Sequence, residues 1–379
     1  MFHYLDNAAT TPVRPEAVRA ALEAMTEIWG NPSSRYALGA RAADQMKIWR
    51  AEVAKALGCR PEELFFTSCG SESDNWAIRG ALEVNRRRGK HIVTTAIEHA
   101  AVLETCKALE RQGYEVTYLQ PDRWGKIDPA QLADALRADT VLVSMMLVNN
   151  ELGTILPVQE AARAIQKAGC PALLHCDAVQ GFLKVPFTPG ELGVDLLSVS
   201  GHKIHAPKGV GALYVRKGLK LPPLIRGGGQ EGGLRSGTEA TSQIAAFAAA
   251  ARLGAETFRE DAARMSDLKA WAVERLAQAV PEAEVLTRDG APHILPITLP
   301  GYKSEVVVRF LSDRGIYLSS GSACHRGRPS HVFAALRLPR QQLDGVLRVS
   351  FSYNTTREDV AALIEGLRAA REQLFTSLS

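Results

Sequence analysis

Apolar residues along the chain fall into two alternating patterns, short continuous runs and longer stretches with helical spacing. Short runs that alternate with helices are typical of buried strands in a mostly parallel sheet, covered by helices on both faces. The pattern therefore predicts an α/β fold. The predicted strands are residues 64–67, 92–95, 116–119, 141–145, 172–176, 196–200 and 211–215.

Helical spacing also flanks this alternating region. Residues 15–29 and 40–57 have the apolar spacing of helices, and Pro15 stands near the start of the first, where a missing N–H costs little. Residues 241–279 predict a long helix, and its alanine-rich part, 244–253, suits a buried helix that links two domains. A smaller α+β unit is predicted beyond it, from residues 295–299, 304–314, 316–319, 346–351 and 357–374.

Composition narrows the class of protein. A chain of 379 residues, 46% hydrophobic and 23% charged, is long enough for two domains with well-buried cores. The net charge of +4 is too small to predict nucleic-acid binding, and the triplet 86–88 of arginines suits a solvated helix end. No apolar run is long enough to cross a bilayer, and the amino terminus has no export pattern, so we expect a cytoplasmic protein without membrane contact.

Cysteine spacing gives no sign of a metal site. The six cysteines form no Cys-x-x-Cys pair, so neither a zinc site nor a disulfide framework is indicated, and we expect no metal.

Lys203 is the first candidate for chemistry. It follows the apolar run 194–199 and stands among Ser200, Gly201 and His202, just past the predicted carboxyl end of a buried strand. Ligands bind at that end in open α/β sheets. Partial burial lowers the pKa of an ammonium group and frees the amine to condense with an aldehyde. The alternative is an ordinary solvated loop lysine, which is what most lysines are.

A second strand end carries a matching acid. Asp177 closes the run 172–176, and pyridoxal phosphate requires a carboxylate that keeps its pyridine nitrogen protonated. Asp177 is the candidate for that carboxylate.

Motifs in the same order along nearly the whole chain resemble the class-V branch of the pyridoxal-phosphate aminotransferase superfamily, and within it the cysteine desulfurases. These motifs are LDNAATTP at 5–12, FTS at 66–68, ESDN at 72–75, EH at 98–99, VNNELG at 148–153, DAVQ at 177–180, SGHK at 200–203, RSGT at 235–238 and SSGSAC at 319–324. The resemblance implies a fold-type-I pyridoxal-phosphate transferase. It implies a large domain of residues 13–260 and a small domain of residues 1–12 and 261–379, which includes the cysteine loop.

The turn before residue 74 is a candidate phosphate site. Gly70 and Ser71 lie in a turn of small residues that opens a helix, where free N–H groups and the helix dipole favour an anion. A helix cap without a ligand explains Ser71 equally well. The resemblance favours the phosphate, adds Ser200 and His202 to its site, and implies that Thr238 reaches it from the other subunit of a homodimer. Residues 227–232 match a G-x-G-x-x-G pattern, but no βαβ unit follows, so we interpret them as a flexible loop.

Further contacts to cofactor and substrate follow from the resemblance. His99 would stack on the pyridine ring and shuttle protons. Asn150 and Gln180 would donate to the phenolic oxygen of the cofactor, and Asn150 would also lie near the substrate carboxylate. Arg348 is a charge within an apolar run, so it should face an anion in a cleft; an internal salt bridge is the alternative. The family uses this arginine for the carboxylate of the amino acid, held in a bidentate fork.

Cys324 is the predicted nucleophile. It is followed by His325 and Arg326, and nearby cations favour the reactive thiolate. The residues alone leave an inert loop cysteine equally open, whereas the motif 321–324 resembles the loop that carries the persulfide of desulfurases. The segment between Cys324 and Pro329 is shorter and more basic than in the commoner branch of the family, so transfer to a large scaffold protein is less secure than persulfide formation.

The resemblance therefore implies an enzyme that converts L-cysteine to L-alanine and passes sulfur from Cys324 to an acceptor, such as an iron–sulfur scaffold. One alternative is selenocysteine lysis or transamination with the same cofactor. A second is a non-catalytic sulfur-relay protein. Neither the acceptor nor the selectivity for cysteine over selenocysteine follows from the sequence.

Overall fold

The computed structural model describes residues 2–287, 289–320 and 330–376. Its larger unit is built on a seven-stranded sheet with the strand order β2-β8-β7-β6-β5-β3-β4. Strand β8 runs antiparallel to its two neighbours, and the other pairs are parallel. The predicted mostly parallel sheet is therefore confirmed. Its strands are β2 (Leu64–Thr67), β3 (His91–Thr95), β4 (Glu115–Leu119), β5 (Thr140–Ser144), β6 (Leu173–Asp177), β7 (Leu196–Ser200) and β8 (Gly211–Val215).

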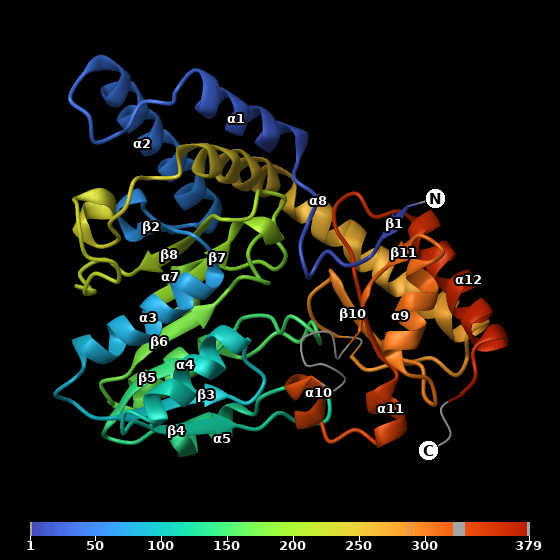
Figure 1. Cartoon of the computed structure of the whole chain (residues 1–379). Coiled ribbons are helices and arrows are strands. Elements are labelled where there is room, and N and C mark those ends of the chain that lie inside the picture. Colours follow the sequence, from blue (N-terminus) through green and yellow to red (C-terminus); the bar gives the residue numbers. More distant parts are fainter. Residues whose placement is uncertain (1, 288, 321–329, 377–379) are drawn as a thin grey trace.

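Helices cover both faces of this sheet (Figure 1). Successive residues of a strand point to opposite faces, so Leu196 packs in the apolar core beneath α3 and α4, while its neighbour Leu197 packs in the core beneath α2, α6 and α8 (Thr241–Ala279). The helices of this unit are α1 (Pro15–Thr26), α2 (Ala37–Leu57), α3 (Gly70–Val84), α4 (Ala100–Glu110), α5 (Pro129–Ala135), α6 (Val158–Ala168) and α7 (Pro189–Leu192).

The smaller unit has a four-stranded sheet in the order β12-β13-β10-β9, with antiparallel neighbours. A separate pair joins β1 to β11 in parallel, so His3 at the amino terminus lies beside Ile316. The strands are β1 (His3–Tyr4), β9 (Glu284–Val285), β10 (Ile294–Thr298), β11 (Ile316–Tyr317), β12 (Ser319–Ser320) and β13 (Val346–Ser350). The helices are α9 (Ser304–Ser312), α10 (His331–Ala335), α11 (Arg340–Asp344) and α12 (Arg357–Gln373).

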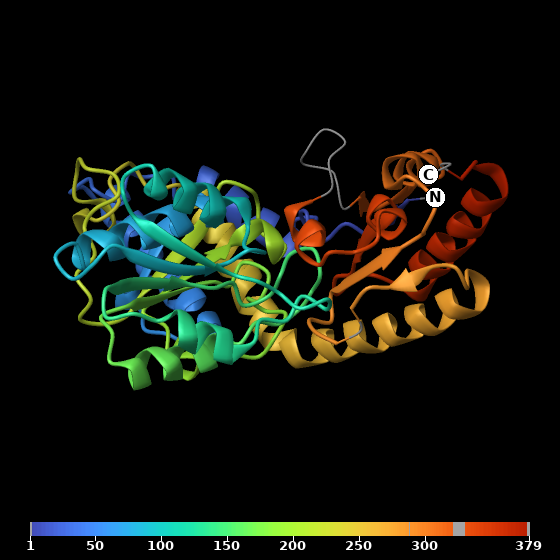
Figure 2. The ribbon, with the colours of Figure 1, turned by 90° about the horizontal axis from the view of Figure 1, so that it is seen from below.

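Helix α8 (Thr241–Ala279) joins the two units, as the helical pattern of the sequence predicts. Its first half, including Phe247, is buried in the core of the large unit, and its second half, including Leu268, packs in the core of the small unit. Figure 2 shows α8 leaving the large sheet and running along the small one. The predicted domain division at residue 260 falls inside this helix and stays a prediction.

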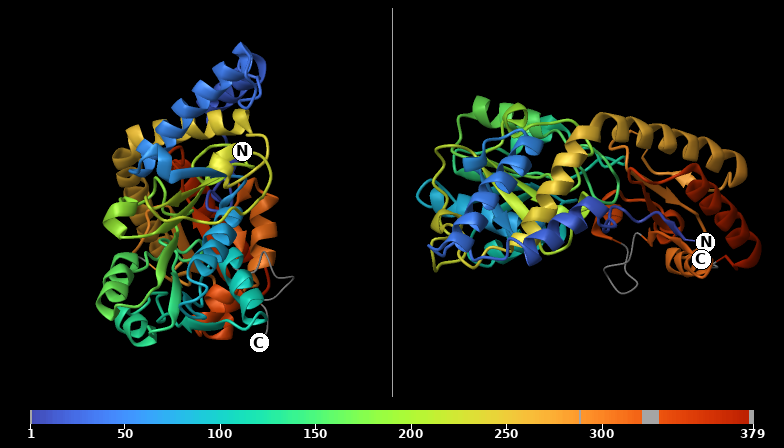
Figure 3. Two further views of the ribbon diagram at one scale, coloured as in Figure 1. Left: turned by 90° about the vertical axis from the view of Figure 1, so that its left-hand side faces the viewer. Right: turned by 90° about the horizontal axis from the view of Figure 1, so that it is seen from above.

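Helices α1 and α2 project from one end of the molecule, as Figure 3 shows. Among the described residues, none of the helices is both long and apolar enough to cross a membrane.

Candidate active site

A cavity of about 460 Å³ opens between the carboxyl ends of the parallel strands and the edge of the small sheet. It gathers side chains from both units, which the sequence placed far apart. The sequence-predicted residues that line it are Gly70, Ser71, His99, Asn150, Asp177, Gln180, Ser200, His202, Lys203 and Arg348.

Two further predicted residues stand apart from this group. Thr238 is exposed and does not line the cavity of its own chain. Cys324 lies outside the described residues.

Lys203 ends the short helix η2 (Gly201–Lys203), which follows directly on β7. Its Nζ atom donates hydrogen bonds to the carbonyl oxygens of Ala8 and Ala9, both at 2.8 Å. Burial, followed by the charge of Arg348, lowers the pKa of Lys203 to about 8. An amine with this pKa is a far better nucleophile near neutral pH than a solvated lysine.

Asp177 is the last residue of β6 and is buried on the floor of the cavity. Its Oδ1 atom accepts a hydrogen bond of 2.9 Å from the backbone N–H of Val179. Burial raises the pKa of Asp177, while the nearby His99 and Lys203 side chains act in the opposite direction and favour its charged form. A second acid, Asp74 of α3, is buried nearby, and both burial and the charge of Asp177 raise its pKa. The floor is therefore suited to bind one positive charge.

His99 is the N-cap of α4 and follows β3, which ends at Thr95. Its Nδ1 atom accepts a 3.1 Å hydrogen bond from the N–H of Ala101. The neutral ring must therefore carry its proton on Nε2. The ring is exposed to the cavity, yet the surrounding protein still lowers the pKa of His99 through desolvation. A flat, neutral ring thus borders the cavity.

Helix α3 begins at Gly70, four residues before the predicted start at residue 74. The small residues of this segment form the first turn of the helix instead of a loop. The free N–H groups of the helix N-terminus therefore lie at the cavity. A Cβ atom added to Gly70 would lie 2.8 Å from Cγ2 of Val179, so only glycine fits here without a shift. The Oγ atom of Ser200 is buried without a hydrogen-bond partner among the described residues. These features are suited to an anion.

His202 lines the same cavity. Burial, with the charges of Lys203 and Lys208, lowers the pKa of His202 to about 4. The imidazole is therefore neutral near pH 7 and meets a ligand through hydrogen bonds rather than through charge.

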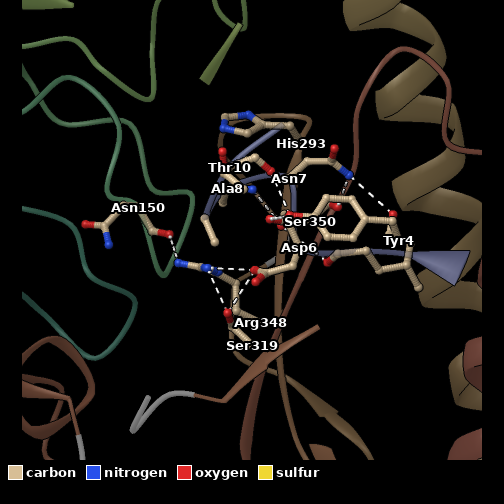
Figure 4. A network of polar contacts seen from close by, with 12 residues as sticks. Tyr4, Asp6, Asn7, Ala8, Thr10, Asn150, His293, Ser319, Arg348 and Ser350 are labelled. Atoms are coloured by element: carbon tan, nitrogen blue, oxygen red, sulfur yellow. Dashed lines mark hydrogen bonds and ion pairs between the residues drawn. The ribbon is translucent and has the colours of Figure 1, made fainter. Parts of the chain in front are cut away.

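Arg348 lies in the middle of β13 and turns its guanidinium toward the cavity (Figure 4). Its Nη2 atom donates to Oδ1 of Asp6 at 2.8 Å and to Oγ of Ser319 at 3.1 Å. Its Nη1 atom donates to the carbonyl oxygen of Asn150 at 3.0 Å. The internal ion pair that the sequence left as an alternative is therefore present, and Arg348 lines the cavity as well.

Sequence reasoning missed the contribution of residues 6–9, which contact both Lys203 and Arg348. Ala8 and Ala9 act through backbone carbonyls, which leave no trace in a side-chain pattern. Asp6 did carry a signal, because it belongs to the LDNAATTP motif at 5–12, but only the fold brings it to Arg348. In the described part of the chain, no group of three or more His, Cys, Asp and Glu side chains is arranged to hold a metal ion.

Comparison with known sequences shows which family this chain belongs to. The family model described as "Aminotransferase class-V" matches residues 3–363. "Cysteine desulfurase IscS" of Methanosarcina thermophila is 42% identical over 96% of this chain and 90% of its own length. "Cysteine desulfurase 2" of Trichormus variabilis is 41% identical over 98% of this chain and 93% of its own length.

Solved structures agree with these sequences. A structure titled "NIFS-LIKE PROTEIN" superposes with a TM-score of 0.93 at 38% identity, covering 99% of this chain and 100% of its own. A second, "SspA in complex with cysteine", has a TM-score of 0.81 at 32% identity, covering 93% of this chain and 100% of its own. Full-length matches at this identity establish that the chain belongs to the class-V aminotransferase family and, within it, to the cysteine desulfurases.

Proposed function

We propose that this protein uses pyridoxal phosphate to convert L-cysteine to L-alanine, with the sulfur carried as a persulfide on Cys324. The observation that carries the proposal is one cavity that holds the Lys203 amine, the Asp177 carboxylate and the Arg348 guanidinium together. An amine of lowered pKa, an acid for a ring nitrogen and a cation for a carboxylate are the groups this chemistry needs.

The residues present fit the cofactor. The N-terminus of α3 at Gly70 and Ser71, with the unpartnered Oγ of Ser200, suits the phosphate. Gln180 is buried beside the cavity and donates from Nε2 to the carbonyl oxygen of Ala8 at 2.9 Å, so its amide is held in a fixed orientation. When bound, the cofactor supplies an electron-withdrawing ring that stabilises negative charge next to the substrate amine.

The protein side of the reaction is proton transfer and orientation. Lys203 would hold the cofactor through its amine, and that amine would be free to move protons once a substrate amine is bound. The freed Lys203 amine and Nε2 of His99 are the groups placed to move protons, because burial lowers the pKa of Lys203 to about 8 and also lowers the pKa of His99, so both can exchange a proton near neutral pH. Asp177 would keep the ring nitrogen of a bound cofactor protonated, and the positive charge there would in turn lower the pKa of this carboxyl.

Substrate orientation is assigned to Arg348 and Asn150. The Nε atom of Arg348 and the Oδ1 atom of Asn150 are both buried without hydrogen-bond partners among the described residues. A carboxylate can accept from Nε, and the same ligand can offer a donor to the amide oxygen. An amino acid supplies both kinds of group.

The sulfur step balances without an external oxidant. The Cys324 thiolate attacks the sulfur of the substrate, an S–S bond forms, and the C–S bond breaks. The electron pair of that bond stays with the substrate carbon, which takes up a proton and leaves as L-alanine. The enzyme retains one additional sulfur atom, which a thiol of an acceptor protein then removes. We infer an iron–sulfur scaffold or another sulfur carrier as acceptor.

We also infer a homodimer. Val18, Leu22 and Met25 form an apolar stripe along α1 and are 52%, 57% and 57% exposed in the single chain, and Trp29, just after the helix, is 62% exposed. Residues at this spacing share one face of a helix, which a second chain can cover. A partner would also explain why Thr238 stays outside the cavity of its own chain. The cytoplasmic location stays a prediction of the sequence.

The test is product analysis. Purified protein incubated with L-cysteine should yield equal amounts of L-alanine and enzyme-bound or released sulfur, and its absorbance should show an attached pyridoxal group that Lys203→Ala abolishes. Formation of a keto acid in place of alanine would identify an aminotransferase. Protein that binds no pyridoxal phosphate would favour the non-catalytic sulfur-relay role, and a parallel assay with selenocysteine measures selectivity.

A further inference from the structure

Among the described residues, Asp6 makes the shortest hydrogen bond to the guanidinium of Arg348. Its Oδ1 atom accepts from Nη2 of Arg348 at 2.8 Å and from Oγ of Ser319, also at 2.8 Å. Figure 4 shows the three side chains grouped at the edge of the small sheet. The pair is largely buried, with 11% of the Arg348 side chain and 20% of the Asp6 side chain exposed. A buried guanidinium would be costly without such a partner.

The backbone around Asp6 is fixed to the strand that carries Arg348. Asp6 forms a parallel bridge with Ser350, and the N–H of Ser350 donates to the carbonyl oxygen of Leu5 at 2.7 Å. The N–H of Ala8 donates to Oγ of Ser350 at 2.9 Å, and Nδ2 of Asn7 donates to its carbonyl oxygen at 3.0 Å. Asp6 therefore moves together with β13 and cannot swing away from Arg348 without breaking several hydrogen bonds.

This contact determines which N–H groups of Arg348 remain for a ligand. Both hydrogens of Nη2 are used, by Asp6 and Ser319, and one hydrogen of Nη1 is used by the carbonyl of Asn150. Either bidentate fork of a guanidinium includes Nη2. With Asp6 in place, the bidentate grip expected from the sequence is not available. A ligand carboxylate is left with Nε and the second hydrogen of Nη1.

We propose that Asp6 is a positioning residue for recognition of the substrate α-carboxylate. It holds Arg348 by Nη2, so that Nε faces the ligand in one fixed orientation. The inference rests on the proposed function, since it concerns how an amino acid is held in the same cavity. Asp6 acts through Arg348 and has no assigned contact with the substrate.

The same segment also sets the position of the reactive amine. Two residues after Asp6, the carbonyl of Ala8 accepts from Nζ of Lys203, and the carbonyl of Ala9 accepts from the same atom. Residues 6–9 therefore span the distance between the carboxylate-binding cation and Lys203. A substrate with its amine and carboxylate on one carbon must match the distance between these two groups. A ligand without a carboxylate does not contact Arg348 and is not constrained by that distance.

The experiment compares two ligands of the holoenzyme, L-alanine and ethylamine, which differ only by the carboxylate. Dissociation constants are measured from the change in cofactor absorbance, for the parent, Asp6→Ala and Asp6→Asn. Because a hydrogen bond between charged groups holds the guanidinium in place, we expect Asp6→Ala to raise the dissociation constant of L-alanine by about tenfold or more. Ethylamine should change by less than about twofold. Asp6→Asn keeps an acceptor oxygen and should lose only part of this selectivity. The KM for L-cysteine should rise in parallel, with kcat changed much less.

His3→Ala is the matched control. Nδ1 of His3 contacts Oδ1 of Asp359 at 2.9 Å, so this change loosens the same N-terminal segment at a point away from Arg348. Its ratio of ethylamine to L-alanine dissociation constants should equal that of the parent. A ratio in Asp6→Ala that equals the parent's, or an equal loss for both ligands, would overturn the proposal. Failure of the proposed function is seen separately, as parent enzyme that makes no alanine from L-cysteine.

Discussion

The Nζ atom of Lys203 lies 2.8 Å from the carbonyl oxygen of Ala8, a residue 195 positions earlier in the chain. The amino-terminal segment thus crosses from the small unit to the strand ends of the large sheet, where its backbone carbonyls accept hydrogen bonds from the Lys203 amine. Carbonyl acceptors favour the charged amine, whereas burial favours the neutral one. Burial is the larger effect, since the pKa of Lys203 falls to about 8.

The first prediction concerns the pH dependence of cofactor attachment. The neutral amine is the form that condenses with an aldehyde, and a lowered pKa means that this form predominates above about pH 8. The rate at which apo-protein binds pyridoxal phosphate should rise with pH and reach half its maximum near pH 8, followed by absorbance. Lys203→Ala should lack this phase. A midpoint near 10, the ordinary value for lysine, would show that the amine is solvated in the apo-protein.

His99→Phe separates stacking from proton transfer. Phenylalanine keeps a flat ring against the cofactor but cannot exchange a proton, and general acid–base groups contribute about 10²–10⁴-fold to rate. We expect the variant to retain the absorbance of bound cofactor while kcat for alanine formation falls by about 10²-fold or more. His99→Ala should lose the rate and also bind the cofactor more weakly. If His99→Phe kept more than half of the parent kcat, the proton-transfer role of His99 would be wrong.

Cys324→Ala tests the sulfur step. This variant should keep the absorbance of the attached cofactor but carry no additional sulfur after incubation with L-cysteine, as measured by mass analysis of the peptide that contains residue 324. The control is Cys59→Ala, because burial raises the pKa of Cys59 to about 12 and so keeps that thiol protonated. Release of sulfide by Cys324→Ala at the parental rate would remove Cys324 from the mechanism.

Much of the large sheet could be predicted from apolar runs, because strands covered on both faces leave a continuous hydrophobic signal. Strand β7 was predicted with the observed limits, 196–200, and β5 was displaced by one residue at each end. The order of the strands was beyond the sequence. Strand β3 lies between β4 and β5, and β8 inserts antiparallel between β2 and β7, through contacts that no local pattern encodes.

The site was predictable where function depends on a side chain at the end of a strand. Asp177 and Lys203 each follow an apolar run and were identified from it, and the structure places both at the cavity. Contacts made by backbone atoms, such as those of Ala8, could not be found in this way. The start of α3 was also misjudged, because glycine and serine are usually turn residues and here they form the first helical turn at a position suited to an anion.

The apolar stripe on α1 gives a prediction about assembly. Leu22→Asp combined with Met25→Asp places two charges where a second chain would pack, so we expect the mass in sedimentation velocity to fall from dimer to monomer. If Thr238 reaches the partner's cofactor phosphate, the monomer should also bind pyridoxal phosphate more weakly. Val306→Asp is the control, because Val306 is similarly exposed, at 49%, but lies on α9. A parent protein that sediments as a monomer, or a double variant that remains a dimer, would contradict the inferred interface.

Glu231 offers a test of stability away from the cavity. It lies in the helix η3 (Gln230–Gly233), within the glycine-rich stretch interpreted from the sequence as a flexible loop. Its carboxylate accepts from Nη2 and Nη1 of Arg50 at 2.7 and 2.8 Å, and from the backbone N–H of Phe66 at 2.9 Å. Only 3% of the Glu231 side chain is exposed. One buried acid therefore ties this stretch to α2 and β2.

Removal of the Glu231 carboxylate should lower the free energy of unfolding. Glu231→Ala leaves Arg50 without its carboxylate and the N–H of Phe66 without an acceptor, and breaking a buried ion pair costs about 3–5 kcal/mol. Since 21% of the Arg50 side chain is exposed, water compensates in part, and we expect a loss of about 3 kcal/mol in the free energy of unfolding. Glu231→Gln keeps the acceptor for Phe66 and should lose less. Urea unfolding at one fixed protein concentration measures both.

The control for this comparison is Asp44→Ala, which breaks an ion pair with Lys47 whose two side chains are 69% and 78% exposed. Solvated pairs contribute little, so its free energy of unfolding should stay within about 0.5 kcal/mol of the parent. If Glu231→Ala were no more destabilising than Asp44→Ala, the glycine-rich stretch would not depend on this ion pair. The sequence interpretation of a freely flexible loop would then be the better description.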